Sequence, residues 1–375
     1  MIRRTLAIGG LLAVAASAQL GPGKWRTDVS KHSIRLNELQ SGGPGKDGIV
    51  ALRDPRFVPV DAARKWLEAR EPVIVVEIGG EVRAYPLQIL LWHELVNDRV
   101  GETPILVSYC PLCNSAVVFD RRVRATTYEF GVSGMLRDSD MVMFDRETES
   151  LWQQITGEAI VGSLTGSQLA IVASQTVSFE MLAEQFPQAL VLSRDTGYSR
   201  RYSENPYVGY EFAGRLMFPV RRTARTKVAS LDRLVAVTGG GHTKAYTFSV
   251  LRRIRVLEDE LGDMRYVVFF DGRVRSALDE ERTRDSRQVG TVGVFSPELD
   301  GRKLTFQSLN ETIRDQETGS SWNVMGMATA GPLLGGKLRP VQHTVAFAFA
   351  WLVFKPDTEV ANFDGRPKNI VAQPR

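Results

Sequence analysis

The feature that most constrains the fold of this 375-residue chain is a similarity between its two halves. The segment 75–85, VVEIGGEVRAY, resembles the segment 235–246, VAVTGGGHTKAY. The Ala-Tyr pairs that end these segments are 161 residues apart (246 − 85 = 161). Self-similarity at a fixed spacing is the sequence signature of a repeated structural unit. The chain is therefore expected to contain one unit twice.

Further segments repeat at similar spacings. Asp145–Thr148 (DRET) matches Asp315–Thr318 (DQET), and Trp152 matches Trp322, each 170 residues later (322 − 152 = 170). The spacing drifts by a few residues between matches, as insertions and deletions in loops would cause. Features present in both copies are expected to serve the fold, and features present in one copy are candidates for function.

The repeated segments have the composition of strands. β-Branched residues from Val73 to Ile78 predict a strand, the pair Gly79-Gly80 predicts a hairpin turn, and Glu81 to Tyr85 returns. Apolar residues at helical spacing then predict a helix from Leu87 to about Asn97. We predict a strand-rich α+β protein made of two related β-rich units, at residues 50–215 and 216–375.

The N-terminus has the pattern of a signal peptide at residues 1–18. Arg3 and Arg4 precede a short apolar run, and Ala16-Ser17-Ala18 is a typical cleavage site. Cleavage there would leave Gln19 as the first residue, followed by an extended lead-in over residues 19–49. The apolar run is short for a membrane span. We expect export to the periplasm or the extracellular space, without stable membrane insertion after cleavage.

Composition sets further bounds. Apolar residues make up 43% of the chain and charged residues 24%, which is typical of a soluble globular protein. The net charge is +4, and the basic residues are dispersed rather than gathered in a run with interleaved aromatic residues. Nucleic-acid binding is therefore not expected.

The two cysteines of the chain, Cys110 and Cys113, form a C-x-x-C motif. Export favours a disulfide unless a metal ion or a reductant intervenes. The second copy lacks these thiols and also lacks the histidine of the preceding helix: Asp271, Val274 and Ile254 stand at the positions of Cys110, Cys113 and His93. Cys110, Cys113 and His93 are thus the candidate site residues.

Three functions remain open for these residues. A thiol-disulfide oxidoreductase would use one thiolate to attack and the other to resolve the mixed disulfide. A metal site would use Cys110, Cys113 and His93, and a thioether from Met135, Met141 or Met143 would favour copper. The third possibility is a non-catalytic exported module with an inert disulfide. The first two would need a redox or a metal-delivery partner.

The first copy also has six extra residues between its matched Phe and Asp positions. Phe130 and Asp145 are 15 residues apart, whereas Phe306 and Asp315 are 9 apart. The extra segment contains two aspartates, Asp138 and Asp140, which we expect to be turn residues.

Several motifs together resemble one known family. They are Trp92–Asp98 (WHELVND), Tyr109–Cys113 (YCPLC), Phe130–Gly134 (FGVSG), Asp145–Thr148 with Leu151-Trp152, and Asn205-Pro206-Tyr207. The family is the uncharacterised prokaryotic one catalogued as domain of unknown function 3179, and the resemblance covers nearly all of the chain after the leader. Some members of that family are selenoproteins, which implies redox chemistry at the cysteine motif. The resemblance also implies a small residue, usually Gly, where this chain has Asn114.

Overall fold

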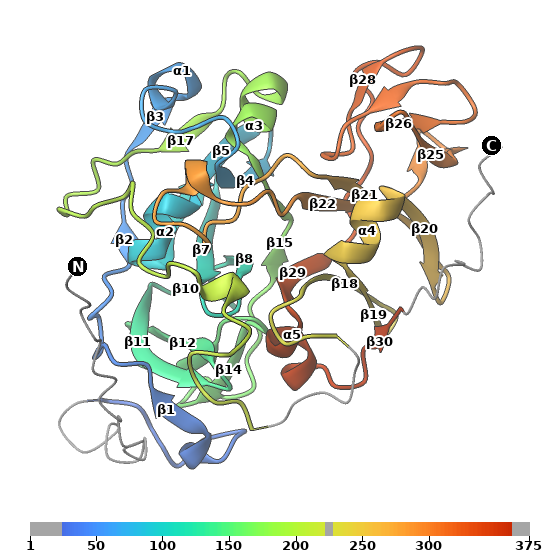
Figure 1. Ribbon diagram of the computed structural model, residues 1–375. Helices are drawn as coiled ribbons and strands as arrows, with labels where there is room; N and C mark the ends of the chain where they lie inside the picture. Colours follow the sequence, from blue (N-terminus) through green and yellow to red (C-terminus); the bar gives the residue numbers. More distant parts are fainter. Residues whose placement is uncertain (1–24, 222–227, 362–375) are drawn as a thin grey trace, which may run out of the picture.

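The computed structural model of the protein describes residues 25–221, here called the first half, and residues 228–361, the second half (Figure 1). The signal peptide predicted for residues 1–18 lies outside the described residues. Strands predominate over helices, so the predicted strand-rich α+β class is confirmed. Within the two described ranges, no helix combines the length and apolarity needed to cross a membrane.

The first half forms three five-stranded sheets. The first contains the cysteine motif and has the order β15 (Ile171–Val172), β8 (Ser115–Asp120), β7 (Thr103–Cys110), β6 (Leu95–Val100), β2 (Leu52–Arg53). The second has the order β16 (Ser174–Ser178), β4 (Pro72–Ile78), β5 (Glu81–Pro86), β17 (Leu190–Leu192), β3 (Phe57–Pro59). The third has the order β1 (Leu39–Ser41), β11 (Phe130–Arg137), β12 (Asp140–Asp145), β13 (Leu151–Gln153), β14 (Glu158–Val161).

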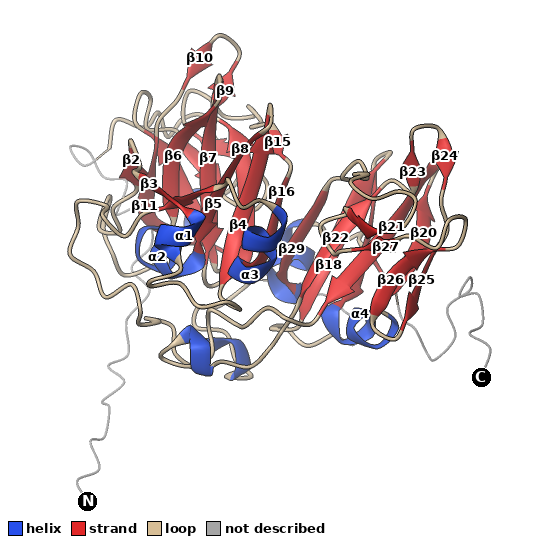
Figure 2. Cartoon of the chain, turned by 90° about the horizontal axis from the view of Figure 1, so that it is seen from above, coloured by secondary structure: helices blue, strands red, loops and turns tan. Residues whose placement is uncertain are grey.

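The second half contains three further sheets of more than two strands. The first has the order β29 (His343–Phe347), β18 (Arg233–Gly239), β19 (His242–Thr247), β30 (Glu359–Val360). The second has the order β20 (Val256–Leu261), β21 (Met264–Asp271), β22 (Thr291–Phe295). The third has the order β25 (Phe306–Leu309), β26 (Thr312–Asp315), β27 (Ser321–Trp322), β28 (Ala328–Ala330). Figure 2 shows the strands of the two halves next to each other, with short helices at one edge. These helices are α1 (Val60–Ala63), α2 (Leu87–His93), α3 (Phe179–Gln185) and α4 (Phe248–Ile254).

The hairpin predicted around Gly79-Gly80 is present as β4 and β5. Both glycines have positive φ values, 60° and 85°, which glycine adopts without steric cost. The helix predicted to reach Asn97 is shorter, because α2 ends at His93. Glu94 has a φ of 58°, which turns the chain out of the helix and into β6.

Part of the lead-in packs on the first half. β1 pairs with β11, and the ring of Trp25 meets the ring of Phe144 edge-on at 5.1 Å between centroids. The lead-in therefore adds a strand to a sheet, which its lack of hydrophobic periodicity did not predict.

The two halves adjoin along β16 of the first half and β22 of the second. Thr291 on β22 donates from Oγ1 to the carbonyl of Thr176 on β16. Gln175 donates from Nε2 to the carbonyl of Val292 at 2.8 Å. The largest hydrophobic cluster extends across this junction. It includes both cysteines, Phe347 of β29 and Trp351 of helix α5 (Ala348–Phe354). The cysteine motif thus belongs to a core that both halves share.

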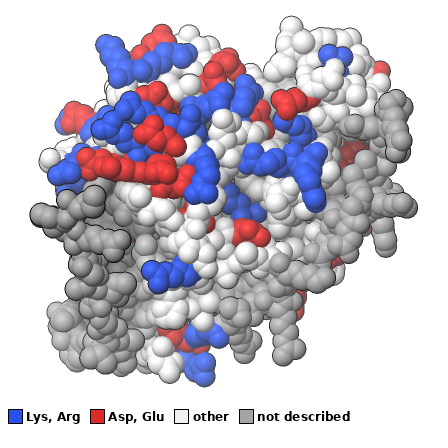
Figure 3. Space-filling view, in the orientation of Figure 1, with Lys and Arg blue, Asp and Glu red and all other residues white. Residues whose placement is uncertain are grey.

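On the face drawn in Figure 3, basic and acidic side chains are interspersed, and they are densest over the part that belongs to the first half. Charged side chains of the first half also form ion pairs, among them Arg146–Asp47 and Arg83–Asp98.

Candidate dithiol–carboxylate site

The C-x-x-C motif forms the turn between two paired strands. Cys110 is the last residue of β7, where it pairs with Ser115 of β8, and Cys113 lies in the turn. The amide of Cys113 donates to the carbonyl of Cys110 at 3.2 Å. Asn114 closes the turn with a φ of 47°, a left-handed conformation that Gly and Asn adopt most readily. The small residue implied at this position by the resemblance has its explanation there.

Asp140 is the third member of the site, and it comes from another sheet. It is the first residue of β12, just after the turn at Asp138 and Ser139. One ligand atom from each of Cys110, Cys113 and Asp140 can be chosen so that all three lie within 4.8 Å of one another. The Sγ of Cys113 donates to Oδ1 of Asp140 at 3.1 Å.

The β11–β12 hairpin carries Asp140 to the thiols. Its strands pair as far as Arg137 and Asp140, on either side of the turn at Asp138 and Ser139. The turn prediction is correct for Asp138, which has a φ of 50° and binds Arg221. It is wrong for Asp140, whose carboxylate points into the core because the hairpin extends over the cysteine turn.

The other oxygen of Asp140 is held by the protein. Oδ2 accepts from Nε2 of Gln153 at 2.5 Å and from the amide of Ile155 at 3.1 Å. The carbonyl of Ser139 accepts a second contact from Sγ of Cys113 at 3.5 Å. The buried hydroxyl of Ser139 has no hydrogen-bond partner among the described residues. The carboxylate of Asp140 is therefore fixed in position, and the hydroxyl oxygen of the preceding residue, Ser139, lacks a hydrogen-bond partner among the described residues.

Burial controls the ionisation of Cys110, Cys113 and Asp140. Loss of solvent raises the pKa of Cys110, and the negative charges of Asp140 and Glu94 raise it further. Loss of solvent also raises the pKa of Cys113 well above its usual value, with added contributions from Cys110 and Asp140. The pKa of Asp140 rises to about 6 for the same reason, although its hydrogen bonds from Gln153 and Cys113 oppose the rise. Without a bound cation, both thiols are protonated at neutral pH.

Glu94 is a second buried carboxyl group near the thiols. Desolvation raises its pKa to about 8, opposed by the hydrogen bond from the Tyr207 hydroxyl, which lies 3.4 Å from its Oε1. The carbonyl of Glu94 accepts from the amide of Tyr109 at 2.8 Å, which fixes the helix end against the strand that leads to Cys110. Its positive φ is shared by Arg255 at the end of α4, so this conformation is a property of the fold rather than of the site.

His93, the third residue predicted for the site, is not brought together with the cysteines. Its Nδ1 lies 2.7 Å from the carbonyl of Val50, and its Nε2 lies 2.7 Å from the hydroxyl of Tyr202. The carbonyl can only accept, so Nδ1 carries the proton and Nε2 accepts from Tyr202. Burial lowers the pKa of His93, which favours this neutral form. Its neighbour Glu94, at the helix end, is the residue of this helix whose charge raises the pKa of Cys110, in addition to the charge of Asp140.

The site is closed from solvent. Cys110 is 1% exposed and Cys113 is 0% exposed. The hydroxyl of Tyr210 donates to the carbonyl of Leu112 at 3.0 Å, and the amide of Phe347 donates to the carbonyl of Cys113 at 2.8 Å. The second half thus covers the cysteine turn through a direct hydrogen bond.

The fold and the site define a strand-rich protein with a buried dithiol–carboxylate group at the junction of its halves. The chain belongs to the family described as protein of unknown function DUF3179, whose model matches residues 46–358. No match was found among curated proteins or among solved structures.

Proposed function

We propose that Cys110, Cys113 and Asp140 bind a metal ion of the class that thiolates prefer, Zn(II) or Cu(I). The observation that carries this proposal is that their ligand atoms all lie within 4.8 Å of one another. A Zn–S bond of about 2.3 Å in tetrahedral geometry separates two sulfurs by about 3.8 Å. Ligand atoms this close need only small movements to surround one ion.

The charges of the group support the same proposal. Two thiolates and a carboxylate would place three negative charges in a buried volume, and the raised pKa values reflect that cost. A divalent or monovalent cation would displace the thiol protons and offset the repulsion among the two thiolates and the carboxylate. Zn(II) accepts mixed sulfur and oxygen ligands, whereas Cu(I) is satisfied by the two sulfurs.

Metal titration of the reduced protein tests this function and separates the two ions. Cys113→Ser should abolish tight binding of either ion. Asp140→Asn should weaken Zn(II) binding by about tenfold and Cu(I) binding much less, because only Zn(II) needs the oxygen ligand. Asp138→Asn is the matched control, because it removes a carboxylate from the same hairpin at a position bound to Arg221. Failure of both ions to bind the wild-type protein would contradict the proposal.

A thiol-disulfide function is the second candidate, and the contact between Cys113 and Asp140 favours it. A carboxylate with a pKa of about 6 is suited to accept the thiol proton. Disulfide formation between Cys110 and Cys113 would then pass two electrons and two protons to a disulfide partner, which would be reduced to a dithiol. Burial makes this the second choice, because an external sulfur must reach the pair for exchange to occur.

The reduction potential of the pair tests the redox candidate. A functional pair should have a potential above about −300 mV, the limit typical of structural disulfides. A disulfide that resists reduction, in a protein that ignores both ions when reduced, would leave only an inert module.

We also propose that the chain is an internal duplication, with its boundary near residues 215 and 216. The element order supports it: β4–β5–α2–β6–β7 begin at residues 72, 81, 87, 95 and 103, and β18–β19–α4–β20–β21 begin at 233, 242, 248, 256 and 264, each 161 later. The matched side chains also make matched bonds. Trp152 donates to Asp145 at 2.9 Å, and Trp322 donates to Asp315 at 2.9 Å. Superposition of the two halves tests this, and unrelated topologies would contradict the duplication.

The cellular setting remains part of the proposal. Export to the periplasm or the extracellular space would place the thiols in an oxidising compartment, where a bound metal ion protects them from oxidation. The partner would then be a metal-delivery protein, or a redox partner if the second candidate is correct.

A further inference from the structure

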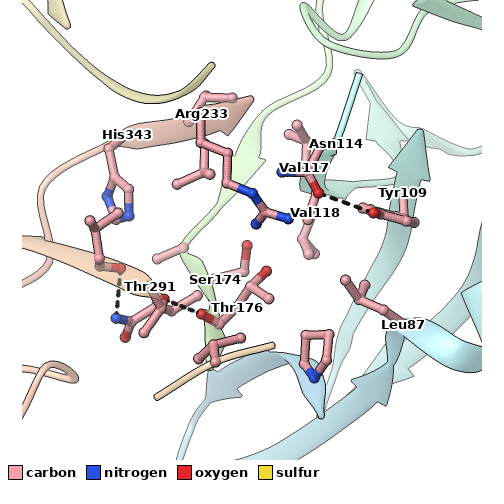
Figure 4. A pocket seen from close by; sticks show the side chains of 18 of the residues that line it. Leu87, Tyr109, Asn114, Val117, Val118, Ser174, Thr176, Arg233, Thr291 and His343 are labelled. Atoms are coloured by element: carbon pink, nitrogen blue, oxygen red, sulfur yellow. Dashed lines mark hydrogen bonds between the residues drawn. The ribbon is translucent and has the colours of Figure 1, made fainter. Parts of the chain in front are cut away.

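A cavity of about 230 Å³ lies between the two halves, beside the cysteine turn (Figure 4). Its walls come from β8 and residues 171–176 on one side and from β22 and residues 340–345 on the other. Tyr109 and Asn114, which flank the two cysteines in sequence, form part of the wall. Cys110, Cys113 and Asp140 do not line it, so the cavity is distinct from the proposed metal site.

The lining of the cavity carries a net positive charge. Arg233 and Arg275 line it, and no Asp or Glu is among its lining residues in the described part of the chain. The charge of Arg233 is offset by Glu211, which lies outside the lining, whereas Arg275 forms no ion pair among the described residues. The unpaired charge of Arg275 favours an anion in this partly enclosed space.

Arg233 is oriented for such a ligand. Its Nε and Nη2 are bound to the two carboxylate oxygens of Glu211, and Glu211 also accepts from the hydroxyl of Ser276. This pairing fixes the guanidinium plane, and Nη1 has no hydrogen-bond partner among the described residues. Figure 4 shows the guanidinium group directed into the cavity from β18, toward Asn114. Nη1 of Arg233 is therefore available to donate to a ligand, while Glu211 fixes the position of the guanidinium group.

Asn114 supplies a second donor. Its Oδ1 accepts from the hydroxyl of Tyr109 at 3.1 Å, which sets the orientation of the amide. Its Nδ2 has no acceptor among the described residues, although Asn114 is only 6% exposed. Because Asn114 lines the cavity, a ligand oxygen there can accept a hydrogen bond from this amide.

The remaining lining shows what else the ligand should carry. Apolar side chains form part of both walls, with Leu87, Val117 and Val118 on one side and Val292 and Val345 on the other. We propose that this cavity binds a small organic acid. Its carboxylate lies between Arg233 and Asn114, and its short apolar body lies against the valines.

Calorimetric titration with benzoate and pentanoate tests the proposal. Both should bind the wild-type protein, and their uncharged amides, benzamide and pentanamide, should bind about tenfold more weakly or not at all, because they carry no charge to pair with Arg233. Inorganic phosphate is included to test for a simple anion site. Absence of carboxylate binding, equal binding of the amides, or tighter binding of phosphate would overturn the proposal.

Two variants locate the binding position. Asn114→Asp keeps the acceptor for Tyr109 and tolerates the positive φ, but it replaces the free donor with a negative charge, so benzoate affinity should fall at least about tenfold. Arg233→Lys keeps a charge for Glu211 but loses the fixed fork, so affinity should fall about fivefold. Unchanged affinity in a folded Asn114→Asp protein, checked by its thermal unfolding, would overturn the assignment.

A third variant separates this inference from the metal proposal. The double substitution Cys110→Ser and Cys113→Ser should abolish metal binding and leave benzoate affinity within about twofold, because neither sulfur lines the cavity. Loss of benzoate binding in this folded variant would contradict a separate organic-acid site.

Discussion

Cys113 and Asp140 are joined by a hydrogen bond of 3.1 Å from Sγ to Oδ1, across 27 positions of sequence and between two sheets. The carboxylate is held in place by Gln153 and Ile155, and the thiol has no exposed surface. The contact places an acidic group with a pKa of about 6 against a thiol whose pKa is raised well above its usual value. Each group therefore controls the protonation of the other.

The first prediction concerns the thiol pKa. Asp140→Asn removes a negative charge that raises the pKa of both Cys110 and Cys113, so both thiols should ionise at lower pH than in the wild-type protein. Thiolate absorbance in the ultraviolet during a pH titration measures this. Asp138→Asn should leave the titration unchanged. A rise in the thiol pKa after Asp140→Asn would contradict the electrostatic description of the site.

The second prediction concerns stability and pH. The folded-state pKa of Glu94 is raised from 4.5 to about 8, so above pH 4.5 the unfolded state loses this proton first. The protein should therefore lose stability as pH rises from 4.5 to 8, by roughly 1.4 kcal/mol for each pH unit at most. Glu94→Gln removes the ionisation, so it should flatten this dependence and be more stable than wild type at pH 8.

Chemical denaturation at several pH values measures the Glu94 effect. The matched control is Glu102→Gln, because the side chain of Glu102 is fully exposed at the end of β6. Its stability should follow the wild-type curve. If Glu94→Gln and wild type lose stability in parallel between pH 5 and 8, the buried carboxyl is not the source of the dependence.

The third prediction concerns His93. His93→Ile removes both ring nitrogens and leaves the carbonyl of Val50 and the hydroxyl of Tyr202 without these partners, which should cost roughly 1–3 kcal/mol of unfolding free energy. The thiol pKa and the metal affinity should not change, because the ring contacts neither cysteine. Thiol titration and denaturation of the same sample distinguish the two effects. A shifted thiol pKa would restore His93 to the site.

The fourth prediction tests the duplication through matched bonds. Asp145 accepts from Thr148 and Trp152, and Asp315 accepts from Thr318 and Trp322, with equal distances in the two motifs for the amide and for the indole. Asp145→Asn and Asp315→Asn should therefore destabilise the protein by similar amounts, roughly 1–3 kcal/mol each. Denaturation of the two variants in parallel measures the difference. A cost confined to one of them would mean that the two motifs serve different purposes.

The fifth prediction concerns the leader. Residues 1–18 have the charge and apolar pattern of a signal peptide, so the exported protein should begin at or near Gln19. Mass spectrometry of the protein recovered from the culture medium or the periplasm identifies the first residue. A full-length chain retained in the membrane would contradict export by cleavage.

Local patterns predicted much of the fold. The strands predicted from Val73 to Ile78 and from Glu81 to Tyr85, with the hairpin turn at Gly79-Gly80, follow from short-range chemistry, namely β-branched runs and a glycine turn, and they are present as β4 and β5. The family could also be recognised from the sequence, because its motifs are local. The helix predicted from Leu87 was longer than α2, because the apolar spacing continues into β6. Only the backbone conformation of Glu94 marks the change from helix to strand.

The site was only partly predictable, because one of its residues comes from a distant strand. Nothing near Cys113 in sequence indicates Asp140, and the only signal was its position in a segment that has no match between Phe306 and Asp315. Glu94 was missed for a different reason. It follows His93 directly, and the sequence does not say which of two successive polar side chains at a helix end affects the pKa of the thiols.

The hydrogen bond from the amide of Phe347 to the carbonyl of Cys113 has a consequence for how this protein can vary. Both atoms belong to the main chain, so the bond is indifferent to the side chain that residue 347 carries. Among the coded amino acids only proline, which has no amide hydrogen, would remove it. Drift in the sequence of the second half can therefore erase side-chain similarity while the link to the cysteine turn persists.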